Sequence, residues 1–291
     1  MLRRTPRRQA ALLAASLLFA IAPTVLGAGA ARADGCADIR IVGIPGTEQG
    51  VQHGYDGTDE RGRTMGPEVA AVVAALREEL TDKTVDEKAI DYQANGVSDF
   101  NWYDAKFRFD RSLYKQSRDA GNNVTFQDLQ TTARKCGSKT KFYLVGFSQG
   151  AHIAGDLVQR ITAEGVPIAK DQLAGAILLS DPAFNPEDRR AHHLTASGPL
   201  GKEMKDTVGV NELLVRDENA PYPGTLGKRD TFADGVRVSS VCILGDPICS
   251  ESWPTTLAAL NIHYKLYRSD LPVADGNRPD IAHWAVSKLS Y

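Results

Sequence analysis

The sequence predicts an α/β fold in which helices cover both faces of a parallel sheet. Short apolar runs typical of buried strands alternate along the chain with segments whose apolar residues recur at helical spacing. Repeated strand–helix–strand units of this kind predict a three-layer arrangement around a parallel sheet. The chain has 291 residues and shows no internal repeat or low-complexity linker, so nothing in it marks a boundary between two domains.

Each expected element has its own pattern. Five segments are apolar and rich in β-branched or aromatic residues, which indicates strands. They are residues 39–45, 89–94, 142–147, 174–180 and 236–242. Four segments carry one apolar face at helical spacing, and the first has Pro67 in its opening turn, where proline suits a helix. They are residues 67–83, residues 124–135, the segment that begins at Gln149, and residues 279–289.

Two stretches do not fit a minimal α/β pattern. Residues 56–63 and residues 185–231 are polar, charged and rich in glycine and proline, so we interpret them as surface insertions. The second is long enough to cover a site.

The first 33 residues are typical of an export signal. Four arginines precede an apolar run, and Ala31-Arg32-Ala33 is a small-residue cleavage site. An uncleaved membrane anchor is the alternative, but Pro23 and Gly27 interrupt the apolar run, which is short for a membrane span. We therefore expect a secreted, extracellular protein with a single domain over residues 34–291.

The charge of the mature chain narrows the choice of partners. Residues 1–33 hold five of the 34 basic residues and none of the 36 acidic ones, which leaves 29 basic against 36 acidic residues and a net charge of −7. A nucleic-acid or anionic-membrane partner requires a basic face. We expect a monomer with no nucleic-acid partner and no stable membrane insertion.

The four cysteines all lie in the exported part, where an even number indicates two disulfides with three possible pairings. Cys242 and Cys249 enclose a short loop and pair most simply with each other, which leaves Cys36 for Cys136. A metal site is the alternative, but the sequence contains no CxxC or HExxH motif, and the adjacent His192 and His193 cannot both face one ion from a regular element. We expect no metal.

Residues 146–150, Gly-Phe-Ser-Gln-Gly, lie between an expected strand and an expected helix. A serine between two glycines at such a turn is a nucleophile elbow, because the glycines allow a turn too tight for side chains. The elbow holds the serine at the carboxyl edge of the sheet, where ligands bind in parallel α/β folds. The helix behind it directs free N–H groups at any oxyanion formed there. Ser148 is therefore the candidate nucleophile.

A serine nucleophile needs a base and an acid that orients the base, and in this elbow the acid and then the histidine follow the serine along the chain. Four of the downstream histidines are poorly placed. His152 lies in the elbow helix, His192 and His193 in the long insertion, and His283 in the terminal helix. His263 follows the apolar run 257–262 and suits a loop at the catalytic edge.

Two acids compete to orient His263. Asp181 ends one expected strand, and Asp246 lies in the loop Cys242-Ile-Leu-Gly-Asp-Pro-Ile-Cys249 that follows another. We favour Asp246, because a disulfide-closed loop would fix the position that an orienting carboxylate requires.

Together these residues resemble the cutinase family of secreted serine esterases. The resemblance rests on the Gly146–Ala151 elbow, on the cysteine-flanked Gly-Asp loop, on Gly46-Thr47-Glu48 after the first strand, and on a paired Cys36 and Cys136. It extends from Cys36 to the end of the chain. The cysteine-flanked loop is its most specific part, since a general α/β-hydrolase has no reason to contain it.

The resemblance implies a three-layer α/β-hydrolase-type fold with a central parallel sheet of about five strands. It implies Ser148 as nucleophile, Asp246 as orienting acid and His263 as base, with no cofactor. The oxyanion would be bound by the backbone N–H of Gln149 and by the backbone and hydroxyl of Thr47.

The expected function is a secreted serine esterase that hydrolyses carboxylic esters of the cutin, lipid or polyester type. An acetyl esterase acting on acetylated polysaccharide shares this framework. A non-catalytic lipid- or glycan-binding protein on the same scaffold is a weaker alternative, because a binding protein need not keep Ser148, Asp246 and His263. Four apolar residues beside the proposed site slightly favour an acyl chain: Ile44, Phe147, Phe184 and Ile262.

Overall fold

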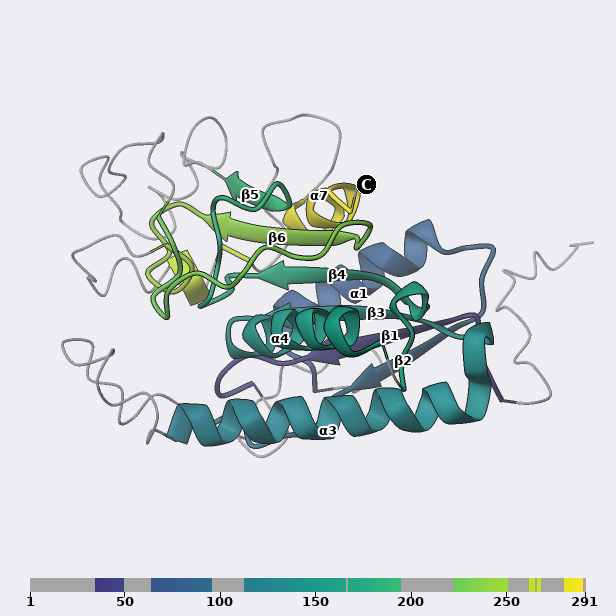
Figure 1. Ribbon diagram of the computed structural model, residues 1–291. Coiled ribbons are helices and arrows are strands. Elements are labelled where there is room, and N and C mark those ends of the chain that lie inside the picture. The colour runs from purple at the N-terminus through teal and green to yellow at the C-terminus, as the bar shows by residue number, and fades with distance from the viewer. Residues whose placement is uncertain are drawn as a thin grey trace, which may run out of the picture.

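The computed structural model describes residues 35–49, 64–95, 113–165, 167–194, 222–250, 262–264, 266–267 and 280–289. Its centre is a six-stranded sheet in the order β2-β1-β3-β4-β6-β5, and all five neighbouring pairs are parallel (Figure 1). The strands are β1 Ile39–Ile44, β2 Val85–Ala89, β3 Lys141–Phe147, β4 Leu173–Leu179, β5 Ala191–Leu194 and β6 Val238–Ile243. The sheet is parallel as predicted, and its six strands agree with the expected number of about five.

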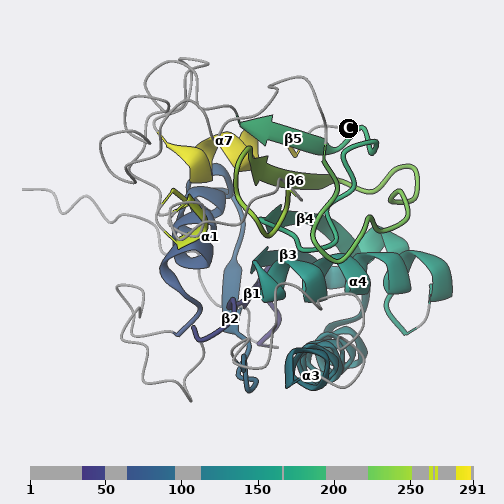
Figure 2. The same ribbon diagram turned by 90° about the vertical axis from the view of Figure 1, so that its left-hand side faces the viewer.

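Helices cover both faces of the sheet, which confirms the three-layer prediction (Figure 2). Helices α1 (Pro67–Glu79) and α7 (Ile281–Ser287) lie on one face and pack against each other. Helices α3 (Leu113–Cys136) and α4 (Gln149–Glu164) lie on the other face. Two short 3₁₀ turns, Gly137–Lys139 and Lys170–Gln172, precede β3 and β4.

The sheet divides the core into two layers. Along β3, Tyr143, Val145 and Phe147 join the apolar cluster under α1 and α7. Phe142 and Leu144 join the cluster under α3 and α4. Because successive side chains of a strand point to opposite faces and both faces are buried here, the central strands are continuous apolar runs. This explains why they could be recognised in the sequence.

The two outer strands differ from the prediction. Strand β2 covers Val85–Ala89, a half-exposed segment with the sequence VDEKA, and not residues 89–94. Strand β5, Ala191–Leu194, lies inside the stretch interpreted as a surface insertion. An edge strand has one neighbour and is only partly buried, so it lacks the apolar run by which we recognised the central strands.

The rest of the long stretch is only partly described, because residues 195–221 lie outside the described residues. Its described parts, residues 185–194 and 222–231, pack against the rest of the fold. Arg190 is buried and donates to the backbone oxygens of Val236, Phe232 and Ala233. A chain that is rich in glycine, proline and charge can therefore be core, provided that its charged groups find backbone partners. The shorter stretch, residues 56–63, lies outside the described residues.

Helix α3 is longer than expected and begins at Leu113 instead of residue 124. Its first half, LYKQSRDAGNN, is polar, and only a narrow stripe of it is buried. Tyr114, Ser117 and Gly121 form that stripe, and they carry too little apolar character to reveal a helix by periodicity.

Two disulfides link the described cysteines. Cys36, just before β1, is bonded to Cys136 at the end of α3, and Cys242 at the end of β6 is bonded to Cys249. This is the pairing expected from the short Cys242–Cys249 loop.

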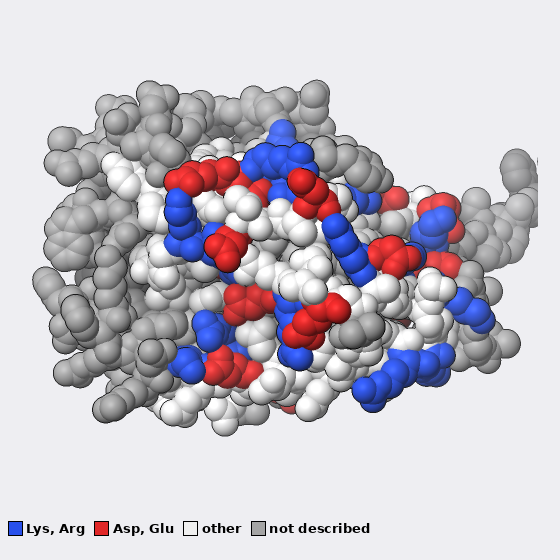
Figure 3. Space-filling view, viewed as in Figure 1, with Lys and Arg blue, Asp and Glu red and all other residues white. Residues whose placement is uncertain are grey.

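Charge is mixed on the surface seen in Figure 3, where basic and acidic side chains lie among one another. The ion pairs between partly exposed side chains include Arg160–Glu164 and Lys141–Asp171. Within the ranges that the structure describes, no helix is both long and apolar enough to cross a membrane.

Candidate active site

Ser148 lies at a sharp turn between β3 and α4. Its backbone has φ 53° and ψ −119°, a conformation that is costly for a residue with a side chain. The flanking glycines make the turn possible. A Cβ on Gly146 would lie 2.2 Å from the carbonyl oxygen of Gly150, and a Cβ on Gly150 would lie 2.1 Å from that of Ile44. The turn therefore has the geometry of a nucleophile elbow.

His263 contacts the serine directly. Its Nε2 lies 3.1 Å from Ser148 Oγ, and its ring stacks on Phe147 with 4.8 Å between ring centroids. Residues 262–264 are helical, and residues 251–261, which include most of the apolar run before them, lie outside the described residues. The stacking and the burial of His263, which is 4% exposed, hold the ring beside the elbow.

Asp246 contacts the other side of the imidazole. Its Oδ2 lies 3.1 Å from His263 Nδ1, and its Oδ1 accepts the backbone N–H of Ile248 at 2.9 Å. Burial alone would raise the pKa of Asp246, but the charge and hydrogen bond of His263 and a hydrogen bond from Ser180 outweigh burial and lower it. Asp246 is therefore a buried carboxylate that is ionised at neutral pH.

Ser180 is a residue that the sequence reading missed. It directly follows β4 and is fully buried. Its Oγ lies 2.5 Å from Asp246 Oδ2 and 2.9 Å from His263 Nδ1. No sequence motif marks a serine in this position, so no signal pointed to it.

The two oxyanion candidates lie near the elbow. Gln149 is the first residue of α4, and its side chain accepts the Ser117 hydroxyl at 2.9 Å. Thr47 lies in the turn after β1. That turn lies against the elbow, because a Cβ on Gly46 would lie 2.9 Å from the ring of Phe147. The turn is fixed by a buried hydrogen bond from Gly46 N–H to Gln49 Oε1 at 3.0 Å.

Asp181, the competing acid, has a different partner. It forms a two-pronged ion pair with Arg229, with distances of 2.7 Å to Nε and 3.0 Å to Nη2. Burial would raise the pKa of Asp181, but the charge of Arg229 outweighs burial and lowers it. Arg229 also pairs with Asp156 on α4 at 3.1 Å. This network ties the segment around residue 229 to α4, so the structure brings Asp246, and not Asp181, to His263.

The other candidate histidines lie elsewhere. His152 Nδ1 contacts the Tyr114 hydroxyl at 3.1 Å, and burial lowers the pKa of His152 to about 4. His192 and His193 lie on β5. His283 on α7 contacts Asp280 and Glu78 at 3.0 Å each.

The four apolar residues thought to favour an acyl chain are core residues. Ile44, Phe147, Phe184 and Ile262 are each 2% exposed or less. They therefore give no information about the substrate. The exposed aromatic residue next to His263 is Tyr264, which is 49% exposed and has its ring edge-on to the imidazole at 5.3 Å.

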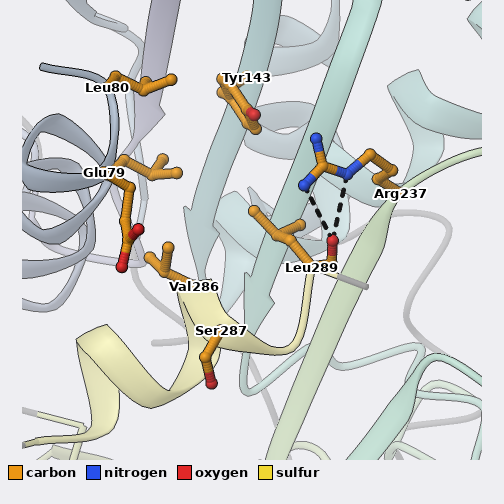
Figure 4. Close-up of a pocket in the computed structure, with 8 residues that line it drawn as sticks. Glu79, Leu80, Tyr143, Arg237, Val286, Ser287 and Leu289 are labelled. Atoms are coloured by element: carbon orange, nitrogen blue, oxygen red, sulfur yellow. Dashed lines mark hydrogen bonds between the residues drawn. The ribbon is translucent and has the colours of Figure 1, made fainter. Parts of the chain in front are cut away.

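A pocket of about 130 Å³ lies near the amino-terminal ends of the central strands, whereas Ser148 lies at their carboxyl ends (Figure 4). It is lined by residues from α1, from α7 and from near the starts of β3 and β6, among them Leu76, Tyr143 and Val286. Arg237 lines one side of it and donates to the carbonyl oxygen of Leu289 at 3.0 and 3.1 Å (Figure 4). The pocket is thus separate from Ser148, which follows the carboxyl end of β3. Among the described side chains, no cluster of three or more histidines, cysteines or acids could hold a metal ion.

Known proteins with similar sequence or structure were found by comparison. The carboxylesterase Culp6 homologue of Corynebacterium glutamicum is 28% identical over 227 residues, which are 74% of this chain and 66% of that protein. A cutinase of Kineococcus radiotolerans is 27% identical over 225 residues, or 76% of this chain and 65% of that protein. The chain thus spans about two thirds of the length of these relatives.

Among solved structures, the catalytic core domain of acetyl xylan esterase from Trichoderma reesei matches with a TM-score of 0.50 and 16% identity. The match covers 79% of this chain and 93% of that domain. It supports the α/β-hydrolase fold. A family model described as cutinase matches residues 55–275, a range that contains Ser148, Asp246 and His263. The resemblance noted in the sequence is therefore confirmed, and the chain belongs to the cutinase family.

Proposed function

We propose that this protein is a carboxylic ester hydrolase in which Ser148 is the nucleophile, His263 the base and Asp246 the orienting acid. One observation carries the proposal. The hydrogen-bond path from Ser148 Oγ through both imidazole nitrogens to Asp246 Oδ2 is continuous, with 3.1 Å at each step. An ionised carboxylate only accepts hydrogen bonds, so the Nδ1 of His263 donates to Asp246 and its Nε2 is free to accept the serine proton.

Acylation follows from this arrangement. As Ser148 Oγ attacks the ester carbonyl carbon, His263 Nε2 takes the hydroxyl proton. The negative charge that develops on the carbonyl oxygen is stabilised by the backbone N–H of Gln149 and by Thr47, and a well-placed donor contributes about 3–4 kcal/mol. His263 then gives the proton to the leaving alkoxide, and an alcohol departs.

Water completes the cycle. His263 accepts a proton from a water molecule that attacks the acyl-enzyme, and it returns that proton to Ser148 Oγ as the carboxylic acid leaves. The cycle needs only water as co-reactant.

The proposed substrates are acyl esters of the cutin, lipid or polyester type. The two relatives reported above, a carboxylesterase homologue and a cutinase, support this class. Acetylated polysaccharide is the alternative substrate, and the test below distinguishes the two.

The test uses purified protein and a series of p-nitrophenyl esters from acetate to long acyl chains. Ser148→Ala should lower turnover by several orders of magnitude and leave the melting temperature close to that of the wild type. An organophosphonate should label the wild type once, on Ser148. Rates that rise with chain length support an acyl-ester substrate, and rates confined to acetate indicate an acetyl esterase.

Ser239→Ala is the matched control. Ser239 is a buried serine on β6, and its Oγ has no hydrogen-bond partner among the described residues, so its loss should not change turnover. Label on another residue, or a fully active Ser148→Ala variant, would refute the proposed role of Ser148.

We also propose that the protein is exported and that residues 1–33 are removed. The two disulfides support an oxidising compartment. The intact mass of protein recovered from the culture medium tests this, and it should correspond to a chain that begins at Asp34. Gel filtration of the same sample tests whether the protein is a monomer.

A further inference from the structure

Ser180 contacts both partners of the proposed charge pair, although no catalytic motif includes it. Its backbone is fixed by the sheet, since its N–H donates to the carbonyl oxygen of Val241 at 2.9 Å. The side chain is fully buried. Its hydroxyl lies between Asp246 Oδ2, at 2.5 Å, and His263 Nδ1, at 2.9 Å.

The direction of each hydrogen bond follows from the acceptors available. The carboxylate of Asp246 cannot donate, so the Ser180 O–H donates to Oδ2. The lone pairs of the same hydroxyl then face the Nδ1–H of His263. That N–H is shared between Ser180 Oγ at 2.9 Å and Asp246 Oδ2 at 3.1 Å. Ser180 thus closes a three-membered ring of hydrogen bonds around the Nδ1 proton.

We propose that Ser180 is a positioning residue, which orients the Asp246 carboxylate and keeps the His263 proton on Nδ1. The proposal rests on the catalytic roles proposed above for Asp246 and His263. With the proton held on Nδ1, Nε2 stays an acceptor for the Ser148 hydroxyl in every turnover. Ser180 itself does not touch the reacting atoms.

The backbone conformation of Ser180 supports a role for its side chain. Its φ is 54°, in the left-handed region that glycine adopts without cost and other residues adopt at a cost. Glycine would suit this backbone better. The local strand bonds use main-chain atoms only, so they do not require the hydroxyl. The side chain therefore carries a conformational cost, and its hydroxyl contacts Asp246 and His263.

Two substitutions separate positioning from stability. Ser180→Ala removes the hydroxyl and keeps the strained φ, whereas Ser180→Gly removes the hydroxyl and relieves the strain. Both variants should lose about tenfold in kcat, with KM close to the wild-type value, because each loses one hydrogen bond to a charged group. Ser180→Gly should melt about 2–4 °C above Ser180→Ala. Ser239→Ala, the buried serine of the neighbouring strand, should keep wild-type kcat.

A merely structural serine predicts a different pattern. Activity would then follow stability, and the more stable Ser180→Gly would keep a kcat close to that of the wild type. That result would overturn the proposal, as would an unchanged kcat in both variants. If Ser180→Ala does not fold, Ser180→Gly alone decides.

A second measurement does not need turnover. The low-field proton resonance of His263 Nδ1–H, assigned by its absence from His263→Ala, should shift in Ser180→Gly because one of its two acceptors is gone. An unchanged resonance would contradict the shared hydrogen bond. If the resonance shifts in Ser180→Gly as expected but the wild-type protein hydrolyses no ester, the proposed function fails while the arrangement around Ser180 stands.

Discussion

Asp246→Asn should mainly lower turnover and Asp181→Asn should mainly lower stability, although both residues are buried acids after neighbouring parallel strands. In Asp246→Asn, the amide oxygen keeps the bond from the Ile248 N–H, since that is an acceptor position. The amide NH₂ then replaces Oδ2 and donates to His263 Nδ1. The histidine must carry its proton on Nε2, where it cannot accept the proton of Ser148. The corresponding change in a serine protease lowers turnover about 10⁴-fold, and we expect a loss of that order here.

Asp181→Asn acts on stability instead. The substitution removes the charge that faces Arg229, whose side chain is only 4% exposed, and it places amide hydrogens against guanidinium hydrogens. Arg229 keeps one carboxylate, Asp156, which is 31% exposed. Breaking one side of a buried ion pair costs about 3–5 kcal/mol, which corresponds to about 10 °C in melting temperature for a domain of this size. The kcat of Asp181→Asn should fall less than tenfold.

The assay measures kcat and KM for a p-nitrophenyl ester at neutral pH and 25 °C, together with thermal unfolding by circular dichroism. Asp246→Asn should combine the large kinetic effect with the smaller change in melting temperature. If Asp181→Asn is the kinetically damaged variant and Asp246→Asn turns over at more than a tenth of the wild-type rate, the assignment of the orienting acid is wrong.

Two further predictions concern the disulfides and the buried histidine. The bridges close loops with sequence separations of 7 and 100 residues, so their chain-entropy contributions are about 2.4 and about 4.7 kcal/mol. Replacing Cys242 and Cys249 by alanine should lower kcat strongly and the melting temperature only slightly, because Asp246 lies in that short loop. Replacing Cys36 and Cys136 by alanine should mainly lower the melting temperature. If both double variants lost kcat equally, the proposed role of the short loop would be contradicted. His152 has a folded-state pKa of about 4 against an ordinary value near 6.5, so the unfolded chain binds more protons between these values. Stability should fall by up to about 3 kcal/mol as the pH drops from 6.5 to 4, and His152→Gln should flatten that slope in melting curves.

The sequence predicts the centre of the fold better than its edges, for a physical reason. Strands β1, β3, β4 and β6 are buried on both faces, and their apolar runs locate them to within about two residues. Strands β2 and β5 are outermost, and their sequences VDEKA and AHHL carry charge or histidine. Such segments become strands through main-chain pairing with a neighbour, which the local sequence does not encode.

The residues of the candidate site also differ in how far the sequence predicts them. Ser148, Asp246 and His263 could be proposed from the sequence because each has a local signature or a fixed order along the chain. Ser180 has neither, since its importance depends on two residues that lie 66 and 83 positions further on.

The two acids at the carboxyl edge of the sheet, which competed as candidates in the sequence, have different partners in the fold. Asp181 and Asp246 each follow a buried strand and are fully buried, and each has a lowered pKa. They differ in the cation that each one faces. Asp181 faces Arg229, a guanidinium that stays charged at every accessible pH, so this pair can only serve structure. Asp246 faces the Nδ1 of His263, whose Nε2 lies 3.1 Å from Ser148 Oγ, so this pair suits the proposed base and its orienting acid. The chemistry of each carboxylate is thus set by a partner that comes from a distant part of the chain, 48 residues beyond Asp181 in one case and 17 beyond Asp246 in the other.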